Sequence, residues 1–138
     1  MVADPLPILI IGANDRERDW LATCVADLGY AVVLDTPEQI AAAVCTPAPA
    51  AVVIDVSRCR PDAATTLVRR ARAATSGPIL TVVASEDITT GTATLDAGAD
   101  DFLRRPIARQ ELQARLRAHL RPRPRFPSAS HAIRREVP

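Results

Sequence analysis

The sequence predicts an α/β fold built on a parallel β-sheet that helices cover on both faces. Five short apolar runs alternate along the chain with five segments of helical character, an order typical of repeated strand–helix–strand units. The apolar runs are continuous rather than alternating, which indicates strands that are buried on both faces. Right-handed connections between such strands bring several strand ends to one crevice, where open α/β sheets bind ligands.

The strands are predicted from short apolar runs that are bounded by turn-forming or charged residues. The five runs lie at 8–11, 31–34, 51–54, 79–83 and 102–103. The third run leads directly into Asp55, and Gly77-Pro78 marks the turn before the fourth. A carboxylate at the end of a parallel strand lies where these sheets place their chemistry, so Asp55 is the first candidate functional residue.

Helices are predicted between the strands and after the last of them. They cover 15–28, 37–44, a segment that opens at Pro61, 88–97 and 108–120. Gly29 is a typical stop for the first helix, and the Thr-Pro-Glu sequence at 36–38 is a typical start for the second. Leucines at 112, 116 and 120 share one face of the last helix. The segment at 88–97 is rich in Thr and therefore has a weak helix propensity.

The chain has 138 residues, enough for one domain with a buried core. We expect this domain at 1–120 and an Arg/Pro-rich flexible tail at 121–138. The tail holds five Arg and one Glu and therefore has a charge of +4. Because the whole chain has a net charge of +1, the domain has a charge of −3. No apolar run could span a bilayer, and no secretory leader is recognisable. Cys24, Cys45 and Cys59 are widely spaced and odd in number, which favours reduced thiols and a cytoplasmic location.

Residues 98–107, Gly-Ala-Asp-Asp-Phe-Leu-Arg-Arg-Pro-Ile, form the most distinctive motif of the chain. This motif is similar to the Gly-Ala-x-Asp-Tyr-Leu-x-Lys-Pro-Phe of receiver domains in two-component response regulators, and the resemblance covers about residues 6–120. Asp55 matches the phospho-acceptor of that family, and 111–117 resembles the last helix of receivers attached to winged-helix transcription factors. The resemblance implies a CheY-like, flavodoxin-like doubly wound sheet of order 2-1-3-4-5 with five flanking helices. It also implies a module of phosphorelay signal transduction rather than an enzyme.

The chain departs from the receiver pattern at the residues that handle Mg²⁺ and phosphate. The family holds Mg²⁺ with two adjacent acids after the first strand, and these positions fall on Gly12 and Ala13, which offer no side-chain ligand. The Ser or Thr that binds the phosphoryl group falls on Val83, which has no hydroxyl. The family's Lys falls on Arg105, which keeps the charge, and its switch aromatic falls on Phe102.

Loss of the acid pair has consequences for the metal and for Asp55. We expect no metal cofactor, with weak Mg²⁺ binding as the alternative. Asp15 and Asp55 would be the remaining ligands, although Asp15 is better placed to cap the first helix. Ser85 is a weak substitute for the missing hydroxyl. Without a competing metal, we expect Asp55 to pair with Arg105 in the resting protein.

Receivers transmit their signal through the surface formed by the fourth helix, the fifth strand and the fifth helix. The charged residues of that surface would be Asp96, Asp100, Asp101, Arg104, Glu111 and Arg115. We expect a signalling protein to bind there, either a histidine kinase or an output protein, with a homodimer as a second arrangement. The segment 88–97 has no basic residue, so one expected partner of a cross-dimer ion pair is missing.

The leading hypothesis is an atypical receiver, or pseudo-receiver, that acts by protein–protein interaction without Mg²⁺-dependent phosphorylation. The alternative is a receiver that accepts phosphate on Asp55 from a histidine kinase. A third hypothesis is a DNA-associated regulator that binds phosphate through its Arg-rich tail. The tail has no interleaved aromatic residues, which argues against nucleic acid as a partner, and we expect no contact with a membrane.

Overall fold

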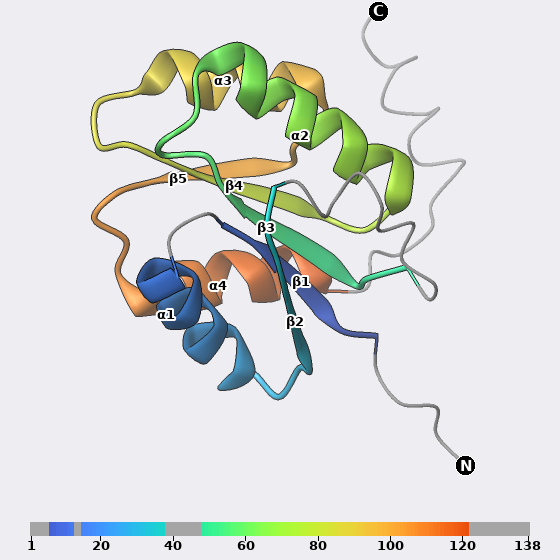
Figure 1. Ribbon diagram of the computed structural model, residues 1–138. Helices are drawn as coiled ribbons and strands as arrows, with labels where there is room; N and C mark the ends of the chain where they lie inside the picture. The colour runs from blue at the N-terminus through green and yellow to red at the C-terminus, as the bar shows by residue number, and fades with distance from the viewer. Residues whose placement is uncertain (1–5, 13–14, 38–47, 122–138) are drawn as a thin grey trace, which may run out of the picture.

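The computed structural model describes residues 6–12, 15–37 and 48–121 of the chain. Within these residues, strands and helices follow one another in the predicted alternating order (Figure 1). The elements are β1 (Ile8–Ile11), α1 (Asp15–Ala26), β2 (Val32–Asp35), β3 (Ala51–Asp55), α2 (Pro61–Ala74), β4 (Ile79–Val83), α3 (Ile88–Ala97), β5 (Asp101–Arg104) and α4 (Arg109–Leu120).

All five strands belong to one parallel sheet, in the order β2-β1-β3-β4-β5. This order confirms the flavodoxin-like topology implied by the resemblance. The central strands β1, β3 and β4 are almost completely buried, because helices cover both faces of the sheet. The edge strands β2 and β5 are more exposed.

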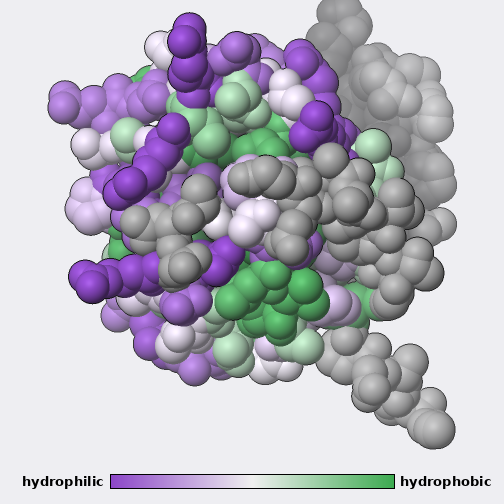
Figure 2. Space-filling model, in the orientation of Figure 1, coloured by the Kyte–Doolittle hydropathy of each residue, from purple (hydrophilic) through white to green (hydrophobic). Residues whose placement is uncertain are grey.

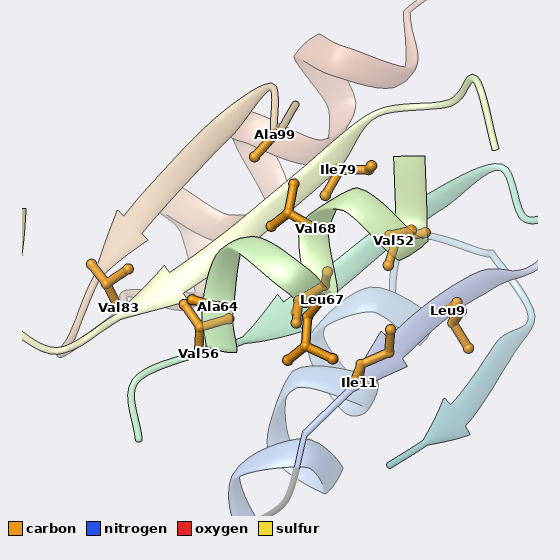
Figure 3. Close-up of a cluster of buried hydrophobic side chains, with 12 residues drawn as sticks. Leu9, Ile11, Val52, Val56, Ala64, Leu67, Val68, Ile79, Val83 and Ala99 are labelled. Carbon is orange, nitrogen blue, oxygen red and sulfur yellow. The ribbon is translucent and has the colours of Figure 1, made fainter. Parts of the chain in front are cut away.

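The helices form one layer on each face of the sheet, with α2 and α3 on one side and α1 and α4 on the other (Figure 1). Ala64, Leu67 and Val68 of α2 pack on alternate residues of the central strands (Figure 3). The intervening strand residues pack on Leu21 of α1 and Leu112 of α4. Successive strand side chains point to opposite faces, and this alternation divides the core into its two halves.

Four helices lie within the described residues, rather than the five that were predicted. The helix expected at 37–44 falls almost entirely on residues 38–47, which lie outside the described part of the chain, as do residues 122–138 of the tail. α1 ends at Ala26, two residues earlier than predicted. The chain then turns through Gly29, whose φ of 94° is a conformation that glycine adopts readily.

Arg72 of α2 ties together the segments at the N-terminal ends of β4 and β5. Its Nη1 donates to the carbonyl of Gly98 at 2.9 Å and to the carboxylate of Asp100 at 3.2 Å. Its Nη2 donates to the carbonyl of Thr75 at 2.9 Å and to the carbonyl of Gly77. One guanidinium therefore joins the end of α2, the turn before β4 and the end of α3.

The surface of the described residues is mostly polar. None of their helices has the length and apolar character needed to cross a membrane. Figure 2 shows a hydrophobic patch at the front of the molecule, where β2 lies. Val33 and Leu34 of this edge strand are 44% and 40% exposed.

Candidate functional site

The C-terminal ends of the parallel strands meet at one edge of the sheet and form the predicted crevice. Asp55 ends β3, Val83 ends β4, and Gly12 directly follows β1. Arg105 follows β5, and its backbone N–H donates to the Val83 carbonyl at 3.0 Å. The fold therefore brings the candidate residues from four separate strands to the same edge.

Asp55 is the centre of this site, and only 6% of its side chain is exposed. Its Oδ1 accepts two hydrogen bonds from Ser57, one from the backbone N–H at 3.0 Å and one from the hydroxyl at 2.6 Å. Its Oδ2 accepts a hydrogen bond from Nη2 of Arg105 at 2.9 Å. Both carboxylate oxygens are engaged, and the expected Asp55–Arg105 pair is present.

Arg105 also contacts a second carboxylate, which the sequence reasoning missed. Its Nη2 lies 2.6 Å from Oε2 of Glu17 on α1, and its Nε donates to the Ser57 hydroxyl at 3.3 Å. The guanidinium therefore bridges β3 and α1 across the crevice. One signal could have identified Glu17: it lies in the first turn of a helix that begins at the crevice. Ser57 could have been identified from its place two residues after Asp55.

The surroundings of Asp55 favour its ionised form. Burial raises the pKa of Asp55, but the two hydrogen bonds from Ser57, the charge of Arg105 and the contact with Glu17 outweigh burial and hold the pKa below its ordinary value. Cys59, nearby on the loop before α2, shows the opposite effect. Burial and the negative charge of Asp55 raise the pKa of Cys59, which keeps its thiol in the less reactive protonated form.

The acid-pair position at Gly12 lacks a carboxylate but has space for one. The carbonyl of Gly12 accepts a hydrogen bond from Nη1 of Arg18 at 3.3 Å. A Cβ atom on Gly12 would lie 3.5 Å from Cβ of Arg18 and 3.6 Å from Cβ of Asp55, which are ordinary contact distances. The residue type, and not a lack of room, therefore removes this ligand. Ala13 and the side chain of Asp15 lie outside the described part of the structure.

Among the described residues, few side chains at this site could ligate a divalent cation of the receiver type. Mg²⁺ requires near-octahedral oxygen coordination, which proteins supply with one or two carboxylates and several waters. The described ranges contain no group of three or more His, Cys, Asp or Glu side chains that could hold a metal ion. The two carboxylates that do converge, Asp55 and Glu17, converge on the guanidinium of Arg105.

Val83 and Phe102, at the two switch positions, make apolar contacts. Val83 is fully buried and belongs to the same cluster as Val56 and Ala64 (Figure 3). Phe102 packs against this cluster, and a Cβ atom on Gly91 of α3 would come within 2.6 to 2.8 Å of its ring. The ring of Phe102 therefore lies directly on Gly91. Neither switch side chain can donate a hydrogen bond to a phosphoryl group.

Three of the expected surface residues form one ion-pair network along β5 and α4. Nη1 of Arg115 lies 3.0 Å from Oδ2 of Asp101, and its Nη2 lies 3.1 Å from Oε2 of Glu111. Nε2 of His119 lies 3.2 Å from the same Asp101 oxygen. The hydrogen bond to Asp101 contributes most to raising the pKa of Arg115 above its ordinary value. The network lies beside a groove of about 610 Å³ between α3 and α4, which Asp101, Glu111 and Arg115 help to line.

The other expected surface residues lie apart from this network. Asp96 and Arg104 are exposed, and within the described ranges their side chains form no ion pair or hydrogen bond. Asp100 precedes β5, where its Oδ2 accepts a hydrogen bond from the Ile79 N–H at 2.8 Å and lies 3.2 Å from Nη1 of Arg72. Asp100 is therefore paired with Arg72 at the N-terminal end of the strand, and its place on the interaction surface stays a prediction.

Comparison with known proteins gives relatives among the response regulators. No protein-family model matches the chain. The chain is 35% identical over 118 residues to response regulator MprA of Mycolicibacterium vanbaalenii, which covers 85% of this chain and 51% of that protein. It is 34% identical over 116 residues to MprA of Mycobacterium avium, with 83% and 50% covered. The chain therefore spans about half the length of the curated relatives it matches.

Solved structures show the same similarity. A protein from Chloroflexus aurantiacus assigned to the response regulators is 27% identical, with a TM-score of 0.71 over 85% of this chain and 98% of that one. The BeF3-activated receiver domain of RstA from Klebsiella pneumoniae is 23% identical, with a TM-score of 0.72 over 84% and 99% of the two chains. At that identity, the second similarity shows the fold alone.

Proposed function

The chain is a receiver domain of the response-regulator type, and we propose that it is an atypical one, which signals through protein–protein contact without Mg²⁺-dependent phosphorylation of Asp55. In this proposal it is a cytoplasmic signalling module rather than an enzyme. One observation carries the proposal. Nη2 of Arg105 lies 2.9 Å from the Asp55 carboxylate, in a crevice where Gly12 stands at the position of a metal-binding acid.

The chemistry of phosphoryl transfer explains why this arrangement disfavours phosphorylation. An attacking carboxylate needs an accessible oxygen lone pair, and the charge of the incoming phosphoryl group needs a cation to offset it. At Asp55, Ser57 donates two hydrogen bonds to one oxygen and Arg105 donates one to the other, which lowers the nucleophilicity of both. Arg105 is already shared with Glu17. A phosphoryl group would therefore add negative charge to a crevice whose guanidinium already serves two carboxylates.

We propose that the partner binds the surface around β5. Arg104 and Asp96 are exposed there, and the apolar side chains of Ile88 and Leu95 on α3 are 45% and 38% exposed. Charged groups that already neutralise one another within the chain, such as Asp101 with Arg115, gain less from pairing across a dimer. The surface therefore favours a different signalling protein, either a histidine kinase or an output protein, over a second copy of this chain.

Backbone NMR of the natural chain tests this proposal. The spectrum would be recorded with Mg²⁺ alone and with Mg²⁺ plus beryllofluoride, a mimic of the phosphoryl group. We expect no saturable shifts at residues 12, 55–57, 83–85 or 105 at millimolar Mg²⁺. Saturable shifts at these residues that disappear in Asp55→Asn would contradict the proposal.

A phosphorylatable receiver is the second candidate. It is favoured by the position of Asp55 at the end of β3 and by the positive charge that Arg105 retains beside it. Transfer from a histidine kinase would require Arg105 to exchange Asp55 and Glu17 for phosphoryl oxygens. Weak Mg²⁺ binding would have to accompany this exchange.

DNA association through the tail is a separate prediction, because residues 122–138 lie outside the described part of the chain. The −3 charge of residues 1–120 opposes binding of the domain itself to a polyanion. A DNA affinity that falls steeply with salt and disappears on deletion of residues 121–138 would support this hypothesis.

A further inference from the structure

We propose that Glu17 determines which cation the Asp55 site holds, because it fixes the guanidinium of Arg105 there as a built-in counter-ion in place of a divalent ion. This inference rests on the proposed function and extends it to how divalent cations are kept out of the site. Glu17 contacts Asp55 as well as Arg105, and in holding the guanidinium it is a positioning residue.

A single nitrogen atom lies between carboxylates from two different elements. Nη2 of Arg105 is 2.6 Å from Oε2 of Glu17 on α1 and 2.9 Å from Oδ2 of Asp55 on β3. The contact with Asp55 is a charge-assisted hydrogen bond, whereas the contact with Glu17 is an ion pair without hydrogen-bond geometry. A divalent cation that bound both carboxylates would compete with this nitrogen for the same two oxygens, Oε2 of Glu17 and Oδ2 of Asp55. It would have to displace Arg105 first.

The three side chains differ in exposure, and the difference shows which of them controls access. The Asp55 side chain is 6% exposed, whereas the side chains of Arg105 and Glu17 are 25% and 30% exposed. Asp55 is therefore the more buried anchor of the guanidinium, and Glu17 is the more exposed one, although the Oε2 atom that contacts Arg105 is itself buried. Loss of the more exposed anchor would let the exposed end of Arg105 move toward solvent while Asp55 stays in place.

Glu17 also has a more ordinary role, and the chain offers a control for it. An acid near the start of a helix interacts favourably with the helix dipole. Asp19 of α1 is another acid near the start of the same helix, and it is exposed. Its side chain makes no ion pair or hydrogen bond within the described ranges. Asp19→Asn therefore removes the same charge from the same helix without touching Arg105.

The test uses a variant in which the acid pair is restored, Gly12→Asp with Ala13→Asp. The contact distances around a Cβ on Gly12 show that this site has room for a side chain. Mg²⁺ affinity would be measured by calorimetry and by fluorescence of Trp20, the only tryptophan of the chain. In this background, we expect Glu17→Gln to bind Mg²⁺ about tenfold more tightly than Asp19→Asn, a difference of about 1.4 kcal/mol.

Two results would overturn the inference. If Glu17 only attracts cations by its charge, Glu17→Gln would bind Mg²⁺ as weakly as Asp19→Asn or more weakly, and the inference would be overturned. Absence of Mg²⁺ binding in both variants would also overturn it. This outcome leaves the proposed function standing, since that is tested on the natural chain.

A second measurement on the natural chain does not depend on the restored pair. The Nε–H group of Arg105 donates to the Ser57 hydroxyl, so its NMR signal reports whether the guanidinium stays in the crevice. We expect Glu17→Gln to increase the exchange of this proton with water, and Asp19→Asn and Glu17→Asp to leave it close to the natural rate. Equal exchange in Glu17→Gln and Asp19→Asn would contradict the role of Glu17.

Discussion

Arg72 and Arg105 lie at opposite ends of the same parallel sheet, and each joins segments that are distant in the sequence. Their side chains have similar exposures, 31% for Arg72 and 25% for Arg105. Their partners differ in kind. Arg72 donates to three backbone carbonyls and one carboxylate, whereas Arg105 contacts two carboxylates and one hydroxyl.

This difference separates a structural network from one that can change partners. The carbonyls around Arg72 are fixed by the course of the main chain, and each would be left without its partner if the guanidinium moved. The carboxylates around Arg105 belong to side chains, which can accept another cation or hydrogen-bond donor in its place. We therefore expect substitutions at Arg72 to affect mainly stability, and substitutions at Arg105 to affect mainly the cation and anion chemistry of the crevice.

The largest effect is expected for Arg72→Ala. Three carbonyls and the Asp100 carboxylate would lose a donor, and we expect the free energy of unfolding to fall by about 3 kcal/mol. Urea unfolding followed by circular dichroism measures this change. Arg69→Ala is the matched control, because Arg69 is exposed on the same helix and forms no ion pair or side-chain hydrogen bond within the described ranges. A similar loss in both variants would contradict the assigned role of Arg72.

A smaller and pH-dependent effect is expected for Arg105→Ala. The pKa of Asp55 is lower in the folded protein than in the unfolded chain, so the contacts of Asp55 stabilise the fold above the ordinary Asp pKa of about 3.9. This stabilisation is lost as the pH falls through the folded pKa. We expect Arg105→Ala to lower the free energy of unfolding by about 1 to 2 kcal/mol at pH 7.

The difference between Arg105→Ala and the natural chain should shrink as the pH falls below the ordinary Asp pKa of about 3.9 and through the lower folded-state pKa of Asp55. Urea unfolding at pH 7, 5 and 3 tests this trend. A loss that stays constant over the whole range would show that Arg105 stabilises the fold by packing rather than through Asp55.

Val83→Thr tests whether the crevice can use a hydroxyl at the end of β4. Val83 is fully buried among apolar side chains, so we expect the new hydroxyl to lower the free energy of unfolding by about 1 kcal/mol. Thermal unfolding of Val83→Thr beside Val83→Ala separates the cost of the hydroxyl from that of the lost methyl groups. A Val83→Thr variant as stable as the natural chain would show that the hydroxyl finds a partner near Arg105.

The smallest effect concerns Cys59, whose pKa is raised by burial and by Asp55. Asp55→Asn removes the negative charge and should lower the pKa of Cys59, which increases its alkylation rate at neutral pH about twofold. Peptide mapping by mass spectrometry follows this one thiol. Asp62→Asn removes an exposed carboxylate of α2 and should leave the rate unchanged. An unchanged alkylation rate in Asp55→Asn would mean that the charge of Asp55 does not affect the pKa of Cys59.

Much of the fold could be predicted from the sequence, because its signals are local. The continuous apolar runs gave all five strands, and Pro61 and Gly29 mark helix boundaries close to those observed. The run at 102–103 was too short to show the full extent of β5, which spans Asp101–Arg104. Its outer residues, Asp101 and Arg104, are charged, so hydrophobicity alone does not reveal them.

The candidate site could be predicted only in part, because its missing members are joined by tertiary contacts. Asp55 and Arg105 were identified by position, and their pairing followed from the absent acids. Glu17 could not be identified by hydrophobic pattern, because an acid on the polar side of a helix has the same pattern whether it faces solvent or a crevice. The pairing of Asp100 with Arg72 was not predicted for a similar reason, because proximity in sequence to Asp101 does not reveal a partner on α2.

The most direct test of the whole account is the intact mass of the protein after incubation with acetyl phosphate and Mg²⁺, with Asp55→Asn as the control. The account predicts no phosphoryl adduct on the natural chain, because Arg105 and Ser57 occupy both oxygens of Asp55 and no acid pair recruits the metal. A stoichiometric adduct on the natural chain that is absent from Asp55→Asn would contradict it, and would show that Asp55 still accepts phosphate.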